Sequence, residues 1–159
     1  MFLPEAKSLV LIADDPDAPS GLFTHWLVWN IPPQTNSIAE GSAPKGVHGT
    51  NDFGKSGYSG PCPPPGTHRY SFKIFALDRE LDLRSGAKRS QVDAAMKGHV
   101  IAQGEFVGRY AREKVARASG LRGTARSQRD ACATMACLRI NASPVLVSTR
   151  NARENLENR

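Results

Sequence analysis

Five side chains that could bind a charged ligand lie at the ends of expected strands, beside proline-rich segments. They are Asp15, Asp17, His25, His68 and Tyr70. Two imidazoles and a phenol supply hydrogen-bond donors for an anion, and a carboxylate can fix the tautomer of an imidazole and favour its protonated form. Because a phosphate-sized anion suits this inventory, the five residues predict an anion-binding site if the fold brings them together.

Each of these residues also has an ordinary structural explanation. A lone aspartate before proline usually forms a turn, because its carboxylate bonds nearby backbone N–H groups. A lone histidine at a strand end is more often a structural residue with a satisfied ring, and a lone tyrosine is usually part of the core. The prediction of a binding site therefore concerns the set and not any single member.

A hydrolase that uses histidine with aspartate is a weaker alternative. The chain has no G-x-S-x-G segment, and Ser59 lies in a glycine-rich stretch without a paired base at a suggestive spacing. A metal enzyme would be favoured by H-x-x-x-H or H-E-x-x-H spacing, which is absent, and Cys132 and Cys137 form a lone C-x4-C pair. We therefore expect no catalytic residue, no metal site and no cofactor.

Runs of apolar and β-branched residues predict the strands that would position the candidate side chains. The clearest strand covers residues 69–77, and others cover residues 8–13, 24–31 and 100–110, the last with a kink at Gly104. In the strand over residues 24–31, one face is expected to carry His25, Leu27, Trp29 and Ile31. In the strand over residues 69–77, the apolar face is expected to carry Tyr70, Phe72, Ile74 and Ala76.

One helix is expected over residues 91–97, with Ser90 as its N-cap, Asp93 in the capping-box position and Gly98 as its stop. Residues 41–66 hold seven of the 14 glycines and five of the 11 prolines, which predicts a long irregular loop of functional use. Rigid apolar walls would come from Pro19, Pro61, Pro63, Pro64 and Pro65. Strands separated by loops, with one helix, indicate a mainly β fold with an antiparallel sheet or sandwich.

The composition divides the chain near residue 112. All 11 aromatic residues lie between Phe2 and Tyr110. Residues 1–112 carry 12 basic and 11 acidic residues, whereas residues 113–159 carry nine basic and four acidic residues. The tail therefore holds +5 of the formal net charge of +6. We expect one packed domain over residues 1–112, followed by a basic tail that is poorly ordered or helical.

The same composition excludes several classes of partner. The arginines of the tail are scattered singly, whereas a nucleic-acid arm would need clustered basic residues, so no nucleic-acid partner is expected. Cys62 is the single cysteine before residue 113, so no disulfide is expected within the domain. The N-terminus does not read as a signal peptide, and no apolar stretch approaches membrane-spanning length, so the simplest location is cytoplasmic.

Ordered motifs follow one another along the domain. Asp15 begins the segment DPDAP, His25 begins HWLVWN, and residues 49–64 contain the blocks GTNDFG and GYSGPCPP. Residues 66–70 read GTHRY, and residues 98–102 read GHVIA. In this order the motifs resemble the phosphatidylethanolamine-binding protein (PEBP) family, in its bacterial Raf-kinase-inhibitor-like branch.

The resemblance extends from about Leu3 to Arg112 and implies a PEBP-like antiparallel β-sandwich. It implies a binding module, rather than an enzyme, for phosphate-containing small molecules, lipid head groups or phosphorylated protein segments. The ligand-binding positions that it implies are Asp15, Pro19, His25, Pro61, Pro63, His68 and Tyr70, with Asp17 and Tyr58 in support. A scaffold or inhibitor that presents its loop to a protein partner, with a vestigial pocket, is the alternative.

The chain departs from the family pattern at both ends. Family members usually have further strands before the segment equivalent to residues 4–8, so a sheet truncated at its N-terminus is expected. Its exposed face and edge would invite a homodimer or aggregation. Residues 113–159 match nothing in the family, which suggests an out-of-frame extension, with a short helical appendage as the alternative.

Overall fold

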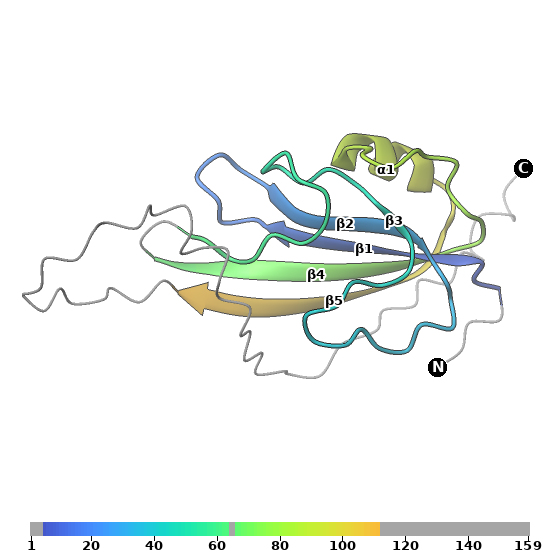
Figure 1. Ribbon diagram of the computed structural model, residues 1–159, viewed down its shortest axis with the longest axis horizontal. Helices are drawn as coiled ribbons and strands as arrows, with labels where there is room; N and C mark the ends of the chain where they lie inside the picture. Colours follow the sequence, from blue (N-terminus) through green and yellow to red (C-terminus); the bar gives the residue numbers. More distant parts are fainter. Residues whose placement is uncertain (1–4, 64–65, 112–159) are drawn as a thin grey trace, which may run out of the picture.

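The computed structural model describes residues 5–63 and 66–111. Within them, the elements are β1 (Ser8–Asp15), β2 (Phe23–Ile31), β3 (Val47–His48), β4 (Thr67–Leu77), α1 (Arg89–Met96) and β5 (Val100–Ala111). The strands form one antiparallel five-stranded sheet in the order β3-β2-β1-β4-β5 (Figure 1). The expectation of a mainly β, antiparallel fold with one short helix is confirmed. Pro64, Pro65 and the predicted tail over residues 113–159 lie outside the described residues.

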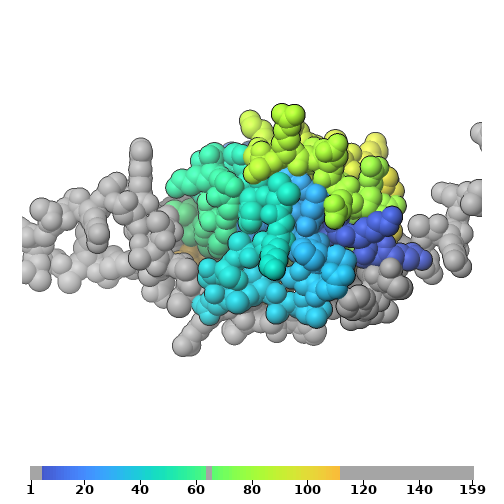
Figure 2. Space-filling view, turned by 45° about the vertical axis from the view of Figure 1, so that its right-hand side comes forward, coloured from blue at the N-terminus to red at the C-terminus, as the bar shows by residue number. Residues whose placement is uncertain are grey.

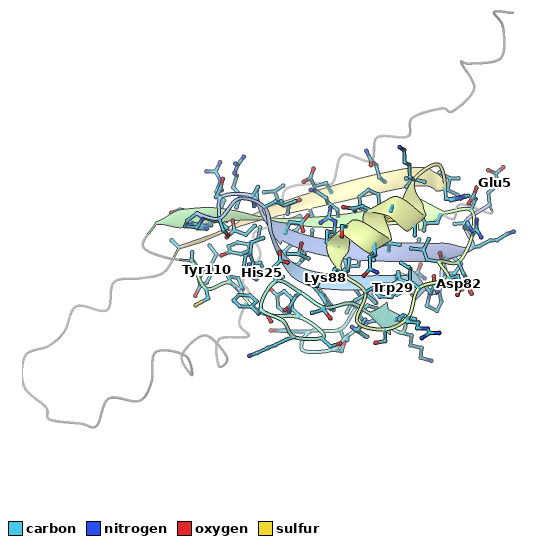
Figure 3. All side chains as sticks on the ribbon, turned by 90° about the horizontal axis from the view of Figure 1, so that it is seen from above. Glu5, His25, Trp29, Asp82, Lys88 and Tyr110 are labelled. Atoms are coloured by element: carbon cyan, nitrogen blue, oxygen red, sulfur yellow. The ribbon has the colours of Figure 1, made fainter. Side chains whose placement is uncertain are left out.

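Both faces of the sheet are apolar, and α1 lies over one of them (Figure 3). On the α1 face, Val10 and Ile12 of β1 pack with Val92 and Met96 of the helix. The opposite face carries a second cluster, made of Leu11, Ala13, Trp26, Val28 and Ile31. Successive side chains of β1 enter opposite clusters. A central strand that is buried on both faces in this way has an unbroken run of apolar residues.

A bulge near the end of β2 changes which face its last residue takes. Between the pairs Leu9↔Ile31 and Leu11↔Val28, β2 has one residue more than β1, and Asn30 in this stretch has a φ of +54°. An extra residue reverses the alternation of side chains beyond it. Ile31 therefore packs away from α1, and the expectation that it shares a face with the alternate residues of β2 is wrong.

A second bulge lies at the start of β2. Between the β1 neighbours Ala13 and Asp14, the partner in β2 moves from Trp26 to Thr24, which leaves His25 as the extra residue. The His25 ring contacts a ring of β4 on the face opposite α1. The expectation that His25 shares a face with the α1-facing residues of β2 is therefore also wrong, because the bulge turns its side chain over.

The strands extend further than the sequence indicates at the end of the sheet that carries the candidate residues. β1 continues through Asp14 and Asp15, which both pair with neighbouring strands, because the first proline follows them. β4 begins at Thr67. Its expected apolar face is interrupted by Ile74, which is exposed. Pairing with β5 passes through Gly104 without a register shift, so no bulge accompanies the kink expected there.

α1 begins earlier than expected, at Arg89 rather than at Gln91. The Gln91 Oε1 atom accepts a 2.9 Å bond from the backbone N–H of the N-cap residue, which sets the start of the helix. Ser90 consequently lies inside the helix. Asp93 is not the capping side chain and instead accepts a 2.8 Å bond from Arg89 Nε. Gly98, with a φ of +83°, follows the end of the helix as expected.

The described part of residues 41–66 is mostly irregular, as expected, but it contains β3 and an isolated bridge between Thr50 and Ser56. This loop is tied to the connection that precedes α1. The Gly86 N–H donates to the carbonyl oxygen of His48 at 2.9 Å. Figure 2 shows the loop (cyan to green) and the α1 region (yellow-green) side by side on one surface.

Candidate functional site

Four of the five chemically promising residues meet at one end of the sheet. They come from the end of β1, the start of β2 and the start of β4, and they are Asp15, His25, His68 and Tyr70. We call these four residues the Asp15 cluster. Figure 3 labels His25 and Tyr110 at this end of the sheet, opposite to the end that carries Glu5. The cluster lies on the face away from α1 because alternation in β4 and the bulge in β2 turn its side chains there.

Asp15 and His68 form a buried pair. The His68 Nδ1 atom lies 2.7 Å from Asp15 Oδ2, and the two residues are only 7% and 3% exposed. The other carboxylate oxygen, Oδ1, accepts a 2.9 Å bond from the backbone N–H of Asp17. Because a carboxylate only accepts, the proton of the neutral His68 ring is held on Nδ1, and Nε2 is the atom left for a ligand.

The His25 ring is fixed in a similar way by a backbone carbonyl. Its Nδ1 atom lies 2.7 Å from the carbonyl oxygen of Ser59, and the Ser59 N–H donates back to the His25 carbonyl at 3.1 Å. The ring also packs edge-on against the rings of Tyr70, Phe23 and Phe53, with centroid distances of 5.2, 5.3 and 5.3 Å. His25 therefore also has Nε2 as the ring nitrogen not engaged by its backbone partner.

Asn51 holds this part of the loop and was not among the predicted site residues. Its amide Nδ2 donates to the carbonyl oxygens of His25 and Gly57 and to Ser59 Oγ, at 3.3, 3.0 and 2.9 Å. Its Oδ1 atom accepts from the N–H groups of Phe53 and Lys55 at 3.1 and 3.0 Å. The available signal was an asparagine within a glycine-rich loop, where such side chains often bond nearby backbone.

Tyr70 contributes a buried hydroxyl that makes no hydrogen bond of normal length among the described residues, although the Asp15 carboxylate is close enough to influence it. The residue is 4% exposed. Burial raises the pKa of the Tyr70 phenol, and the negative charge of Asp15 raises it further, so the hydroxyl keeps its proton. Because an unsatisfied buried hydroxyl costs about 1–3 kcal/mol, this atom is a natural partner for a bound ligand or water.

Asp17 stands outside the Asp15 cluster and pairs with Arg69. The Arg69 Nη2 and Nε atoms donate to the two carboxylate oxygens at 2.6 and 2.9 Å, and the Arg69 backbone N–H adds a 2.9 Å bond. These hydrogen bonds lower the pKa of the Asp17 carboxyl, and the same pairing raises the pKa of Arg69. The structure therefore gives Asp17 the role of fixing the loop after β1 to β4.

The remaining predicted positions lie in the loops and are less uniform. Pro63 is fully buried, Pro61 is half-buried, and Pro19 is exposed. Tyr58 is partly exposed and packs on Trp26, with a centroid distance of 5.2 Å, while burial raises the pKa of its phenol. Tyr58 thus extends the aromatic surface of the face opposite α1.

Neither a metal centre nor a membrane-crossing helix appears in the part of the chain that the structure describes. Among these residues, no three side chains of histidine, cysteine, aspartate or glutamate are placed to hold a metal ion. No helix formed by these residues is both long and apolar enough to cross a membrane.

Comparisons with known proteins identify relatives along the described sheet. The family description "Phosphatidylethanolamine-binding protein" matches residues 2–111. A UPF0098 protein of Pyrococcus horikoshii is 54% identical over 117 residues, which are 67% of this chain and 59% of the relative. A UPF0098 protein of Pyrococcus abyssi is 52% identical over 118 residues, 68% of this chain and 66% of the relative. The chain therefore spans less than two thirds of the length of these two relatives.

Two crystal structures have a similar fold. A PEBP homologue from Chlamydia trachomatis matches with a TM-score of 0.68 and 44% identity, over 70% of this chain and 76% of that one. YbcL of E. coli, described as a member of the mammalian PEBP family, matches with a TM-score of 0.60 and 31% identity, over 70% and 75%. The fold is a small antiparallel β-sheet with a buried polar cluster at one end. The chain belongs to the phosphatidylethanolamine-binding protein family.

Proposed function

We propose that the Asp15 cluster binds an anionic group of the phosphate type, and that the protein is a binding module and not an enzyme. The observation that carries the proposal is the buried Tyr70 hydroxyl, which lacks a partner among the described residues and lies against the His25 ring. A phosphate oxygen would supply the missing acceptor. The family membership supports a binding role of this general kind.

The two imidazoles make the proposed binding dependent on protons. In each ring Nδ1 already bonds an oxygen, of Asp15 or of the Ser59 backbone. A neutral ring therefore has an accepting Nε2, whereas a ring with a second proton has a donating Nε2. A second proton on either ring would therefore give a phosphate oxygen an additional donor.

The polar contacts of the imidazoles argue against nucleophilic catalysis. Activated serine or cysteine nucleophiles lie within hydrogen-bond reach of their base. Within residues 5–63 and 66–111, His68 bonds the Asp15 carboxylate and His25 bonds the Ser59 carbonyl, and neither ring bonds a hydroxyl or thiol. Ser59 Oγ instead accepts from the Asn51 amide.

The test is a calorimetric titration of the full chain with inorganic phosphate and with phosphoethanolamine, at about pH 6 and about pH 7.5. The matched control for His68→Ala is His99→Ala, because His99 also pairs with an aspartate, Asp78 at 3.0 Å, outside the Asp15 cluster. We expect binding by the wild type and by His99→Ala at both pH values, and a loss of binding in His68→Ala. Absence of binding by folded wild-type protein would contradict the proposal.

A protein-binding scaffold is the second candidate, and the exposed aromatic rings of the loop favour it. Phe53 and Tyr58 are both 44% exposed, although Phe53 packs edge-on against His25. A partner protein could cover these rings, since aromatic residues often anchor interfaces. If the scaffold reading is right, Phe53→Ser would abolish capture of a partner while His68→Ala would leave it unchanged.

A further inference from the structure

β5 is an edge strand of the sheet, beyond β4 (Figure 1). It is 12 residues long, and its outer side pairs with no other strand among residues 5–63 and 66–111. Long unpaired edges offer a template for another chain, and proteins usually protect them with charged side chains, especially lysine, with proline or with a bulge. Residues 103–111, QGEFVGRYA, contain neither lysine nor proline and pair with β4 without a register shift, and their two charged residues, Glu105 and Arg109, have opposite signs.

We propose that β5 pairs antiparallel with β5 of a second copy of this chain, with Val107 facing its own counterpart on the two-fold axis. This register places Glu105 of each copy opposite Arg109 of the other. Opposite charges that face each other across antiparallel strands stabilise the pairing. Val107 is 48% exposed, so its contact with the counterpart would remove apolar surface from water.

The opposite face of β5 is also complementary in this register. Its alternate residues are Gly104, Phe106, Gly108 and Tyr110, and the Phe106 ring lies 6.3 Å from the ring of Phe72 in β4. Phe106 of one copy would lie opposite Gly108 of the other, and Tyr110 opposite Gly104. An aromatic ring placed across from a strand glycine covers the glycine backbone and stabilises the sheet edge. Each bulky ring thus meets a position without a side chain.

Neighbouring registers lack this match. An axis at Phe106 would set Glu105 opposite Val107 and leave two glycines facing each other. An axis at Glu105 would bring two carboxylates together, which is destabilising. An axis at Gly108 would set Arg109 opposite Val107. The charge pattern therefore selects the axis at Val107.

The local contacts leave Glu105 able to make the new pair. Ser71 Oγ donates to Glu105 Oε1, so the carboxylate is held on the α1 face of the sheet and its Oε2 atom has no partner among the described residues. A carboxylate can accept several bonds at once. The guanidinium of Arg109 from the second copy could therefore bond it without displacing Ser71.

Sedimentation velocity of the full chain over a range of concentrations tests the proposal by charge reversal. We expect the wild type to dimerise, and Glu105→Arg and Arg109→Glu each to weaken the dimer on the order of tenfold or more, because each turns two attractive pairs into repulsive ones. An equimolar mixture of the two variants should associate again, since opposite charges then face each other. The double variant Glu105→Arg/Arg109→Glu should form a homodimer.

Lys97→Glu is the matched control, because it also reverses one exposed charge but lies at the end of α1. It should dimerise like the wild type. Restored association in the mixture also shows that both single variants are folded. A monomeric wild type, reversals that behave like the control, or a mixture that stays monomeric would each overturn the proposed pairing.

Discussion

Asp15 and His68 are separated by 53 positions in the chain, yet their side chains meet at 2.7 Å in a buried pair. The carboxylate uses its other oxygen to accept the Asp17 N–H, so both of its oxygens are occupied. His68 is thus oriented by a residue that is itself held by the loop after β1. In proteins, such an orienting carboxylate fixes both the tautomer and the direction of an imidazole.

Replacing Asp15 with asparagine should loosen His68 without removing it. We expect the phosphate affinity of Asp15→Asn to fall on the order of tenfold, the lower end of the loss that metal sites show when a group that orients a ligating histidine is removed. Nitrogen NMR of the imidazoles should show His68 changing from one tautomer to a mixture, with His25 unchanged. Asp78→Asn is the control, because Asp78 pairs with His99 instead. An unchanged His68 tautomer would contradict the orienting role of Asp15.

Asn51 should contribute to stability more than an ordinary loop residue. It is almost fully buried, and its removal would leave the Ser59 hydroxyl and several backbone groups without a partner. We expect Asn51→Ala to lower the free energy of unfolding by about 1–3 kcal/mol, measured by urea denaturation. Asn36→Ala, at an exposed position, should change it by less than about 0.5 kcal/mol. Equal effects of the two variants would show that the Asn51 bonds do not hold the loop.

The face of β2 on which His25 lies illustrates what the sequence could and could not predict. The alternation in residues 24–31 correctly places Leu27 and Trp29 together on the α1 face. It fails for His25, which is itself the extra residue of one bulge, and for Ile31, which follows the other bulge. The pattern of residue types reveals neither bulge.

The bulge before Ile31 has a tertiary cause. Asn30 adopts its positive φ while its side chain bonds the backbone of Leu81 in both directions, at 2.9 and 2.8 Å. Leu81 is 51 positions away, so no local signal announces this contact. By contrast, strands and loops depend on local composition and were predictable. The chemically promising residues could be named from their types, but their meeting at one end of the sheet depends on strand order.

Removing the Tyr70 hydroxyl should raise the stability of the protein and weaken its binding of phosphate. Because this buried hydroxyl lacks a partner among the described residues, Tyr70→Phe should raise the free energy of unfolding by about 1 kcal/mol. The same change should weaken phosphate binding about fivefold to tenfold, by one lost hydrogen bond. A large loss of stability in Tyr70→Phe would instead indicate a structural bond of the hydroxyl.

The ionisation of Tyr70 should make the protein less stable in alkali. Burial, with the charge of Asp15, raises the folded-state pKa of this phenol above its ordinary value of 10.0. The unfolded chain therefore loses the Tyr70 proton first, and the free energy of unfolding should fall as the pH rises above that value. Denaturation at increasing pH should show a shallower fall in Tyr70→Phe than in the wild type. Identical pH profiles would contradict the raised pKa.

The ion pair under α1 gives the largest stability effect that we expect. Asp14 is completely buried, and Arg89 Nη1 donates to its two oxygens at 2.6 and 2.7 Å, while Lys73 Nζ lies further away at 3.4 Å. Burial lowers the pKa of Arg89, but its bonds to Asp14 and Asp93 outweigh this effect and raise it overall.

Replacing Arg89 with leucine would leave the buried Asp14 carboxylate with only its weaker partners. Such a change typically costs about 3–5 kcal/mol, and we expect a loss of this size in the free energy of unfolding of Arg89→Leu. Adding Asp14→Asn should recover part of the loss, because the buried charge is then removed as well. Arg84→Leu, at an exposed arginine, is the control and should cost less than about 0.5 kcal/mol. If the double variant Arg89→Leu/Asp14→Asn were less stable than Arg89→Leu, the unpaired charge of Asp14 would not be the cause of the loss. The cause would then be the lost packing of the Arg89 side chain against the sheet.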